Sequence, residues 1–560
     1  MFLRGLRIEN FRAIRKTTIS FNDGTVLMGE NDCGISSVLD ALELVLGFYD
    51  KNEVFPPFLF HYPNGADQPA GPIRIQLRFG ERRPGEWDGQ EYEPYLFLLP
   101  KKNKRLREIW YETVINPGES PESAAHYRLR APGNKSKTSD PELIGRFRRM
   151  NPVIRVSAGM LTGHGASRGR ENENGPAHKV STEVRELMSR IRRAVDSRLH
   201  GLSTDLKADL EDGYAAAHRL IELNEFKLGK WESGLTRSVG EIIGWSPGTS
   251  SAPAPGPLHY PHSTQERLGT LLLIAALIRA RPGGMAPDAD PLWIIEEPEA
   301  HLHPITLTSV AIFVSMIQRQ KIVTTYSGEL LAAVSLGQVR RLVRYNGELF
   351  EQRVRKTALS RQELRRFQYH LRSRFAIASF ARLWLLVEGE SEYWLLPQIA
   401  RLMGYEFPLE GIACVVFAQC GLDPPLKVSR ELGIEWHLLA DGDAAGKAYA
   451  QTAQTYLGSD PPGERLTLLR QKDIERCFWD HGYDDLYKRI AGLPDGKLQK
   501  LSPGRIIQAA VRRRSKPFLA LSIVEAMAVE GSPGIPPVLQ QLVETCVKMA
   551  REAPVRIAGQ

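Results

Sequence analysis

The chain has 560 residues, 42% of them hydrophobic and 25% charged, with a formal net charge of +8. This length and balance predict several domains with their own cores and exclude a largely disordered chain. The longest apolar run, residues 268–278, is too short to cross a bilayer. Five scattered cysteines without a C-x-x-C pair exclude a disulfide framework and a zinc finger. We therefore expect a cytoplasmic protein, with no membrane association and with no secretory signal, because Arg4, Arg7 and Glu9 interrupt the first apolar residues.

The first 28 residues predict short strands, and they lead into a loop suited to cradling phosphates. The loop is GENDCGISS, Gly29 to Ser37, and the apolar spacing of SSVLDALELVLG predicts a helix directly after it. Glycines let backbone N–H groups close around phosphates at a helix N-terminus, where the dipole favours anions. Gly34 and Ser36 fit this use, but Ile35 stands where such loops carry a lysine. The change removes a charge-assisted contact to the γ-phosphate, so we expect ATP to be bound weakly or without hydrolysis.

The middle of the chain alternates between strand-like, polar and helical stretches. Residues 50–110 mix turns with strand-like pieces such as IRIQLRF, and residues 115–182 are polar and rich in Gly, Ser and Asn. The pattern of residues 183–235 predicts charged helices, a candidate dimerisation element. A Pro-rich connector and another predicted helix, at 264–280, precede the next strand.

A continuous apolar run, LWII at 292–295, predicts a strand that is buried on both faces. It delivers Glu296 and Glu297 to its carboxyl end, which is where open α/β sheets bind their ligands. Another strand, KIVTT at 321–325, is followed directly by Tyr326. This part of the chain therefore completes a candidate nucleotide site.

Two acidic motifs follow two predicted strands in the last third of the chain. WLLVEGESE places Glu388 at the end of a buried strand and Glu392 in the first turn of a helix, while EWHLLADGDAAG ends another strand with Asp441 and Asp443. Residues two apart on a strand point to the same side, and Gly442 permits a tight turn between the aspartates. Four converging carboxylates require a cation, because like charges repel and burial is costly. Hard oxygen ligands favour Mg²⁺ or Mn²⁺, and two such ions would promote phosphodiester cleavage.

The segments of the first half resemble ATPase heads of the ABC type, in the branch of RecF and SMC proteins. LRGLRIENFRAI is similar to the first strands of that branch, LWIIEEPEAHLHP to its Walker B motif and adjoining loop, and KIVTTYSGELL to its switch region. The resemblance implies that Glu296 holds the Mg²⁺ shell and that Glu297 polarises the attacking water. Such heads carry a histidine where this chain has Tyr326, a second departure beside the γ-phosphate. The implied nucleotide site comprises Arg12, Gly29, Asn31, Gly34, Ser36, Ser37, Glu296 and Glu297.

The pattern E-G-x-S-E followed by D-G-D resembles a TOPRIM domain. Glu475, in QKDIERCF, resembles the late acidic residue of TOPRIM nucleases, with Asp473 as a rival for that role. Lys516, in RRRSKPFLAL, resembles the lysine that such nucleases place against the scissile phosphate, and a surface salt bridge is its alternative. The implied metal ligands, which are also catalytic, are Glu388, Glu392, Asp441 and Asp443.

Other features have two interpretations each. His301 and His303 form either a metal pair or, as in the resembling heads, part of a packing and dimer-contact loop. The basic runs 101–105, 146–149 and 512–516 are compact enough to contact phosphates, or they are solvated surface.

A RecF-like head followed by a TOPRIM domain is the layout of the overcoming-lysogenization-defect (OLD) nucleases, and this chain resembles their bacterial single-gene type. The expected fold is α/β, an ABC-type head with a helical insertion followed by a Rossmann-like TOPRIM domain. We predict the head at 1–182 and 236–351, the insertion at 183–235, a helical linker at 352–378, and the TOPRIM domain with a C-terminal extension at 379–560.

The resemblance implies a Mg²⁺- or Mn²⁺-dependent endonuclease that nicks or cleaves DNA as a homodimer, with a role in phage defence or DNA repair. Its degenerate head would serve as a scaffold or a nucleotide sensor, and a partner protein could supply what the head lacks. One alternative is a non-catalytic, DNA-binding or regulatory ABC-like protein. Another is topoisomerase- or primase-like TOPRIM chemistry, although no region resembles a DNA-cleavage domain that presents a nucleophilic tyrosine.

Overall fold

The computed structural model describes residues 1–47, 55–63, 66–99, 106–118, 125–132, 136–157, 289–300, 320–370 and 376–558. The described chain forms two compact units. The first, here called the head unit, comprises Met1–Val334 and Gln338–Glu351; the second, the C-terminal unit, comprises Ser335–Gly337 and Gln352–Gln560. The predicted insertion at 183–235, the basic run 101–105 and the pair His301 and His303 lie outside the described residues.

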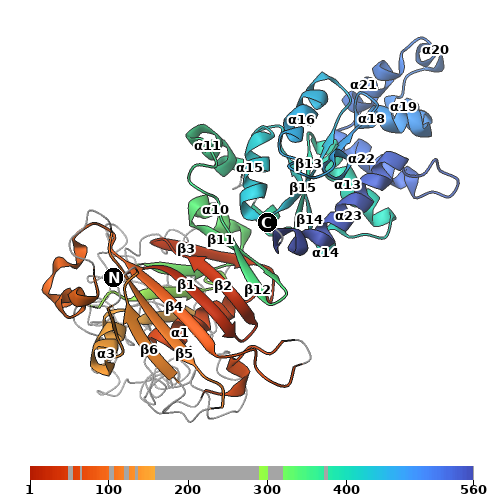
Figure 1. The fold of residues 1–560 in the computed structure, drawn as a ribbon. Coiled ribbons are helices and arrows are strands. Elements are labelled where there is room, and N and C mark those ends of the chain that lie inside the picture. The colour runs from red at the N-terminus through yellow and green to blue at the C-terminus, as the bar shows by residue number, and fades with distance from the viewer. Residues whose placement is uncertain are drawn as a thin grey trace, which may run out of the picture. The chain divides into compact units, whose positions relative to one another are not determined.

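One large mixed sheet organises the head unit (Figure 1). Within the described residues its strand order is β7-β6-β5-β4-β1-β2-β12-β11-β3-β10-β9-β8. The bounds of its strands are β1 Phe2–Phe11, β2 Ile14–Ser20, β3 Gly24–Gly29, β4 Ile73–Gly80, β5 Glu108–Ile115, β6 Ala125–Arg130, β7 Lys137–Thr138, β8 Val153–Ser157, β9 Leu292–Glu296, β10 Lys321–Thr324, β11 Val339–Tyr345 and β12 Glu348–Gln352.

The sheet has an antiparallel half and a parallel half. Strands β1, β2, β4, β5, β6 and β7 pair antiparallel, whereas β11, β3, β10, β9 and β8 pair parallel. In the parallel half Thr324 pairs with Leu27 on one side and with Glu296 on the other. The loop after β3 and the acidic residues after β9 therefore leave the sheet at the same edge.

Among the described helices of the head unit the longest is α1, which runs from Ile35 to Leu46. Its apolar residues recur at helical spacing, and Val38, Leu39, Leu42 and Val45 are fully buried. This face packs on β1, β3 and β8, so the helix that follows the phosphate loop is anchored in the core. The other helical segments are η1 Pro57–Leu59, η2 Glu86–Asp88, η3 Gln90–Leu98, α3 Pro141–Met150 and α10 Gly328–Ala333; a further one, η5 Leu336–Gln338, spans the boundary between the units.

The C-terminal unit is built on a four-stranded parallel sheet with the order β14-β13-β15-β16. Its strands are β13 Leu383–Val387, β14 Ile412–Val416, β15 Glu435–Ala440 and β16 Leu466–Leu468. Every residue of β13 and β15 is buried, as expected for a parallel sheet with helices on both faces. Figure 1 shows this sheet between α15 and α16 on one side and α13, α22 and α23 on the other.

Helices account for most of the C-terminal unit outside its sheet. Helix α13 packs on α22 and α23, and α23 also contacts β13, β14 and β15, so these elements share one apolar core. Each fully buried Leu or Val of that core contributes about 1.5–3 kcal/mol. The helical bounds are α11 Arg361–His370, α12 Ala376–Ala378, α13 Glu390–Leu402, α14 Phe407–Glu410, α15 Asp423–Leu432, α16 Ala444–Gln454, α17 Pro462–Arg465, α18 Ile474–Phe478, the π-helix η7 Trp479–Tyr483, α19 Asp484–Ala491, α20 Asp495–Leu498, α21 Pro503–Arg513, α22 Lys516–Met527 and α23 Pro537–Ala558.

Among the described helices none combines the length and the apolar character that a bilayer-spanning segment needs. The segment predicted as a helical linker, 352–378, contains α11 and the three-residue α12.

Candidate active site

The candidate site of the C-terminal unit lies where β13 and β15 end. These strands are parallel neighbours, so the residues that follow them meet at one edge of the sheet. Glu388 comes directly after β13, and Asp441 comes directly after β15. The sequence placed Asp441 and Asp443 on a strand, but β15 ends at Ala440 and Asp443 is already the N-cap of α16. The prediction that Asp441 and Asp443 lie on a strand and therefore point to the same side was wrong, because the chain turns immediately after Ala440.

Two glycines let the backbone close tightly around this turn. A Cβ atom on Gly442 would collide with the carbonyl oxygens of Leu469 and Gln471, in the segment that follows β16. A Cβ atom on Gly446 would collide with the backbone of Asp441. Gly442 is thus required for the close approach of another segment, to which its N–H donates a hydrogen bond (2.9 Å to Gln471 O), rather than for an unusual backbone turn.

Asp441 has a strongly perturbed pKa. Burial and, in decreasing order, the charges of Glu392, Glu388, Asp473 and Glu475 together raise the pKa of its carboxyl group from 3.8 to about 8. A carboxyl group with this pKa holds a proton at neutral pH unless a cation replaces that proton. The charges of the other acidic groups of the site therefore all act on the carboxyl group of Asp441.

Glu388 is the second perturbed carboxylate. Burial raises its pKa, the charge of Asp443 raises it further, and the charge of Lys516 opposes both. Its Oε2 atom is buried and accepts no hydrogen bond. An unsatisfied buried carboxylate oxygen is costly, and a bound cation would satisfy it.

The remaining acidic side chains of the site are held by hydrogen bonds. Glu392 accepts from the Gly389 N–H (3.1 Å) and Asp443 from the Gly446 N–H (2.8 Å), both at helix N-termini. Asp473 accepts from the Arg476 N–H (2.8 Å) at the start of α18. Glu475, which is buried, accepts from the hydroxyl group of Ser391 (2.8 Å).

The hydroxyl of Ser391 thus connects α13 to α18 and fixes the carboxylate of Glu475. The carboxylates of Glu392, Asp443 and Asp473 are fixed by backbone N–H groups. These four carboxylates are therefore oriented before any ligand arrives.

Lys516 lies beside this acidic group. Its Nζ atom is 4.0 Å from Glu475 Oε1, and its side chain is 53% exposed. Its charge lowers the pKa values of Glu388 and Glu392 against the burial that raises them. Lys516 therefore forms a salt bridge at the edge of the acidic site, and its contact with a scissile phosphate stays a prediction.

The acidic side chains do not form a closed ligand shell as they stand. In the described part of the chain no three Asp, Glu, His or Cys side chains converge closely enough to hold one ion together. The cause is local, because Glu392 and Asp443 turn to their helix N-termini and like charges repel. The donor set still fits a hard divalent cation: carboxylate oxygens, one of them unsatisfied, around a carboxyl group whose pKa is about 8.

The predicted nucleotide site of the head unit is assembled at the edge described above. Gly29 ends β3, Gly34 has a left-handed backbone (φ 114°) before α1, and Ser36 is exposed in the first turn. Asn31 lies exposed in the loop between them. Ser37 and Ile35 are buried, and the Ile35 side chain belongs to the hydrophobic core. The residue that replaces the lysine thus points into the protein.

Strained backbone marks the same region. Arg12 (φ 49°), Asp32 (φ 61°) and Glu297 (φ 46°) are three of the five non-glycine residues with positive φ among those described. Such conformations cost about 1–3 kcal/mol each and cluster at functional sites. Burial raises the pKa values of Glu297 and Tyr326, and each is raised further by neighbouring charges, for Tyr326 those of Cys33 and Glu297. The phosphate loop, the Walker B segment and the switch region therefore face one another.

An arginine that the sequence analysis did not identify forms ion pairs with an acidic residue of this site. Arg155, on β8, forms ion pairs with Asp40 (2.6 Å), Glu43 (2.9 Å) and Glu296 (3.0 Å). Burial alone would lower the pKa of Arg155, but the charges of Glu296 and Asp40 raise it. Arg12 also pairs with Asp40. Glu296, predicted to hold the Mg²⁺ shell, thus forms an ion pair with a guanidinium group.

Comparison with known proteins shows which family the chain belongs to. A family model described as "Protein of unknown function (DUF2813)" matches residues 1–378. A relative, the uncharacterized protein YbjD of Escherichia coli (strain K12), is 31% identical over 573 residues, which cover 98% of this chain and 99% of the relative. The chain belongs to the DUF2813 family. A second model, described as the overcoming lysogenization defect protein-like TOPRIM domain, matches residues 380–443 of this DUF2813 protein.

The predicted resemblance to OLD proteins is therefore confirmed, as is the α/β class with a C-terminal TOPRIM domain. The TOPRIM match includes Glu388, Glu392, Asp441 and Asp443, and it ends before Glu475 and Lys516.

Solved structures similar to parts of the DUF2813 protein include an SMC head and the C-terminal region of an OLD protein. The structure of an SMC head bound to the C-terminal winged-helix domain of ScpA aligns with a TM-score of 0.37 and 16% identity, over 64% of this chain and 99% of that one. The C-terminal region of the OLD protein of Xanthomonas campestris pv. campestris aligns with a TM-score of 0.25 and 15% identity, over 31% of this chain and 95% of that one.

Sequence reasoning missed several residues of both sites in this DUF2813 protein. Arg155 and Asp40 carry no motif, and β8 and β9 become neighbours only in the folded sheet. Ser391 lies inside the E-G-x-S-E pattern, and the capping positions of a helix could have identified it as a polar residue facing the site.

Proposed function

We propose that this protein is a metal-dependent DNA endonuclease, which nicks or cleaves phosphodiester bonds with the carboxylates of its TOPRIM domain. The OLD-like TOPRIM match supports a nuclease-type family. The electrostatic environment of Asp441 carries the proposal, because one carboxyl group with a pKa near 8 among four other acidic residues is a site built for cations.

The residues that would hold the metal are Glu388, Asp441 and Asp443, with Glu392 and Glu475 beside them. A divalent cation at these oxygens would supply an activated water and would stabilise the leaving oxygen of the phosphodiester. The chain itself contributes orientation: backbone N–H groups fix Glu392 and Asp443, and the Ser391 hydroxyl fixes Glu475.

Lys516 would contact the scissile phosphate. Its ammonium group is half-exposed and lies at the edge of the acidic site, so an incoming phosphate can reach it without displacing buried groups. A lysine in this place neutralises a phosphate oxygen and attracts the negatively charged backbone into a site that would otherwise repel it. The net charge of +8 supports nucleic acid as the substrate.

The head would act as a dimer scaffold or a nucleotide sensor rather than as a rapid ATPase. Three observations support this role: Ile35 is buried, Tyr326 replaces the switch histidine, and Arg155 occupies Glu296. Weak or non-hydrolytic nucleotide binding through the backbone cradle and Ser36 remains compatible with the fold of the loop. A homodimeric nuclease of the cytoplasm, acting in phage defence or DNA repair, is the biological setting that we propose.

Nicking of supercoiled plasmid tests the proposal. With Mg²⁺ or Mn²⁺, the wild type and the surface control Asp495→Ala should both nick, and chelation should stop them. Asp441→Ala should lower the rate by about 100-fold or more, since even outer-shell groups of metal sites are worth 10–100-fold. Nicking that survives Asp441→Ala would refute the site. Re-ligated topoisomers would indicate topoisomerase chemistry, and DNA binding without any cleavage would indicate the non-catalytic alternative.

A further inference from the structure

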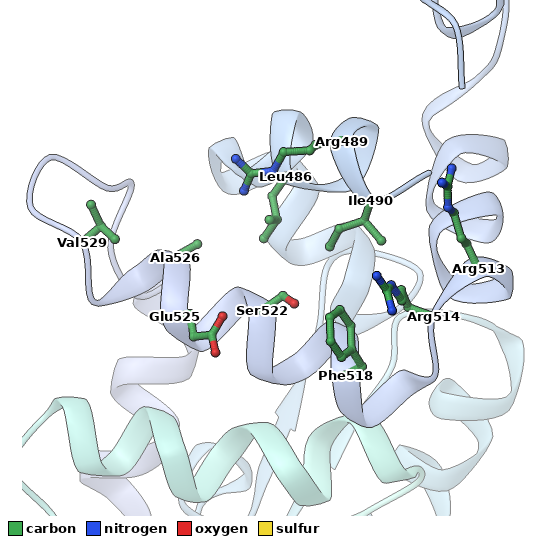
Figure 2. A pocket seen from close by; sticks show the side chains of 10 residues that line it. All are labelled: Leu486, Arg489, Ile490, Arg513, Arg514, Phe518, Ser522, Glu525, Ala526 and Val529. Atoms are coloured by element: carbon green, nitrogen blue, oxygen red, sulfur yellow. The ribbon is translucent and has the colours of Figure 1, made fainter. Parts of the chain in front are cut away.

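A basic groove lies among the helices of the C-terminal unit. Helices α19, α21 and α22 enclose a pocket of about 470 Å³, within the usual size range of ligand sites. Figure 2 shows its lining, here called the arginine groove. Its side chains include Arg489, Arg513, Arg514, Phe518, Leu486 and Glu525.

The arginine groove combines positive charge with an accessible aromatic face. Phe518 is 43% exposed, and the guanidinium carbon of Arg514 lies 4.6 Å from the centre of its ring. Figure 2 shows these two side chains beside each other. Arginine and a solvent-exposed aromatic ring are the groups with which proteins bind the phosphates and the bases of single strands.

Arg513 is held in place by the end of α19. Its Nη1 atom donates to the carbonyl oxygen of Ala491 (3.0 Å). A Cβ atom on Gly492 would collide with this guanidinium group, and Gly492 has a left-handed backbone (φ 58°) that favours glycine. The local structure therefore makes room for one arginine of the groove.

Helix α22 separates the arginine groove from the candidate active site. Arg514 follows α21, Ser515 is the N-cap of α22, and Lys516 begins that helix. Lys516 reaches Glu475 on one side, and Phe518, two residues later, lines the groove on the other. Residues two apart in an α-helix point to nearly opposite sides of its axis, because successive residues turn by about 100°. The groove is therefore a feature of its own rather than an extension of the acidic site.

The charged side chains of the lining favour one end of the arginine groove for a bound phosphate. Glu525 is the acidic residue of the lining, and it lies nine residues beyond Lys516, about 13 Å along α22. A phosphate would avoid that end and would be drawn to Arg513 and Arg514. The basic run 146–149 lies in the head unit, where Arg146 and Arg148 donate to the backbone carbonyls of Glu91 and Gly47.

We propose that the arginine groove binds an unpaired nucleotide of the DNA strand. Phe518 would stack on the base, and Arg489, Arg513 and Arg514 would contact the phosphates. A base inside an intact duplex is stacked on its neighbours and cannot offer its face to Phe518. The preferred substrate is therefore DNA with a single-stranded stretch, an inference that rests on the endonuclease function proposed above.

Binding without metal separates this proposal from the catalytic one. The full-length protein in chelator is titrated with a fluorescein-labelled single-stranded oligodeoxynucleotide and with the duplex of the same sequence, followed by anisotropy. Single strands should bind more tightly than the duplex. Phe518→Ala should weaken single-strand binding by about 5- to 100-fold and leave duplex binding unchanged. Phe518→Trp, which keeps a stacking face, should retain the preference.

Charge variants complete the test. Arg514→Ala should weaken binding and lower the slope of log affinity against log salt by about 1, whereas Arg505→Ala, an exposed residue of α21 outside the groove, should do neither. Equal affinity for single strand and duplex, or a Phe518→Ala protein that keeps the preference, would overturn the proposal. Single-strand binding in the groove without metal-dependent nicking would instead refute the endonuclease function alone.

Discussion

Replacing Asp441 with asparagine should stabilise the metal-free protein and, in the same variant, remove stabilisation by divalent metal. The folded-state pKa of Asp441 is about 8, above its ordinary value of 3.8. The folded protein therefore holds a proton that the unfolded chain releases, and stability falls as the pH rises through this window. Asparagine keeps the shape of the side chain and has no charge to bury.

The size of the effect follows from the pKa difference. At pH 8 the full difference corresponds to about 6 kcal/mol. Because Asp441 is only partly buried and solvent screens part of the repulsion, we expect about 2–4 kcal/mol in favour of the variant. For a unit of this size that is a rise of about 5–10 °C in Tm.

Calorimetric unfolding at pH 8, with chelator and with Mg²⁺, measures both effects. Wild type should gain stability with metal, by about 2.7 kcal/mol at one hundred times Kd. Asp441→Asn should start higher and gain little, and Asp495→Asn, at an exposed position, should behave as wild type. An asparagine variant that is no more stable in chelator, or that gains as much from Mg²⁺ as wild type, would refute the reasoning.

Two further predictions concern stability. His437 is fully buried, and burial together with the charge of Arg465 lowers its pKa to about 4. Unfolded histidine takes up a proton below about pH 6.5, so stability should fall by about 3 kcal/mol from pH 6.5 to pH 4, and urea titrations should show a shallower fall for His437→Gln. In the head, Arg155→Ala leaves Asp40 and Glu296 without this partner and should cost about 2 kcal/mol. Adding Glu296→Gln should restore part of that loss, and an Arg155→Ala protein as stable as wild type would contradict a structural role for the cluster.

The sequence identified the elements that carry the chemistry because each has a strong local pattern. The apolar runs LWLLV and LWII become buried parallel strands, and the acidic residues that follow them stand at the carboxyl ends of the sheets. The glycines of the phosphate loop and its serines also lie where the pattern indicates. These features depend on neighbours in the chain, so periodicity and turn chemistry are enough to find them.

The contacts that depend on distant segments could not be predicted in this way. Arg155 meets Glu296 only because β8 and β9 pair, and Phe518 shares a groove with Arg489 only because α21 packs against both α19 and α22. The sequence pattern also could not decide whether Asp473 or Glu475 is the late acidic residue of the TOPRIM site. In the structure both contribute to the charge around Asp441, but Glu475 is the one that contacts Ser391 and Lys516.

The buried side chain of Ile35 has a consequence for repairing the phosphate loop by mutation. A lysine introduced there would have to leave the core, and the hydrophobic contacts of an isoleucine, about 1.5–3 kcal/mol, would be lost with no immediate gain while Arg155 holds Glu296. A single Ile35→Lys substitution is therefore expected to destabilise the head, and a variant designed to bind a γ-phosphate would also have to release Glu296 from Arg155.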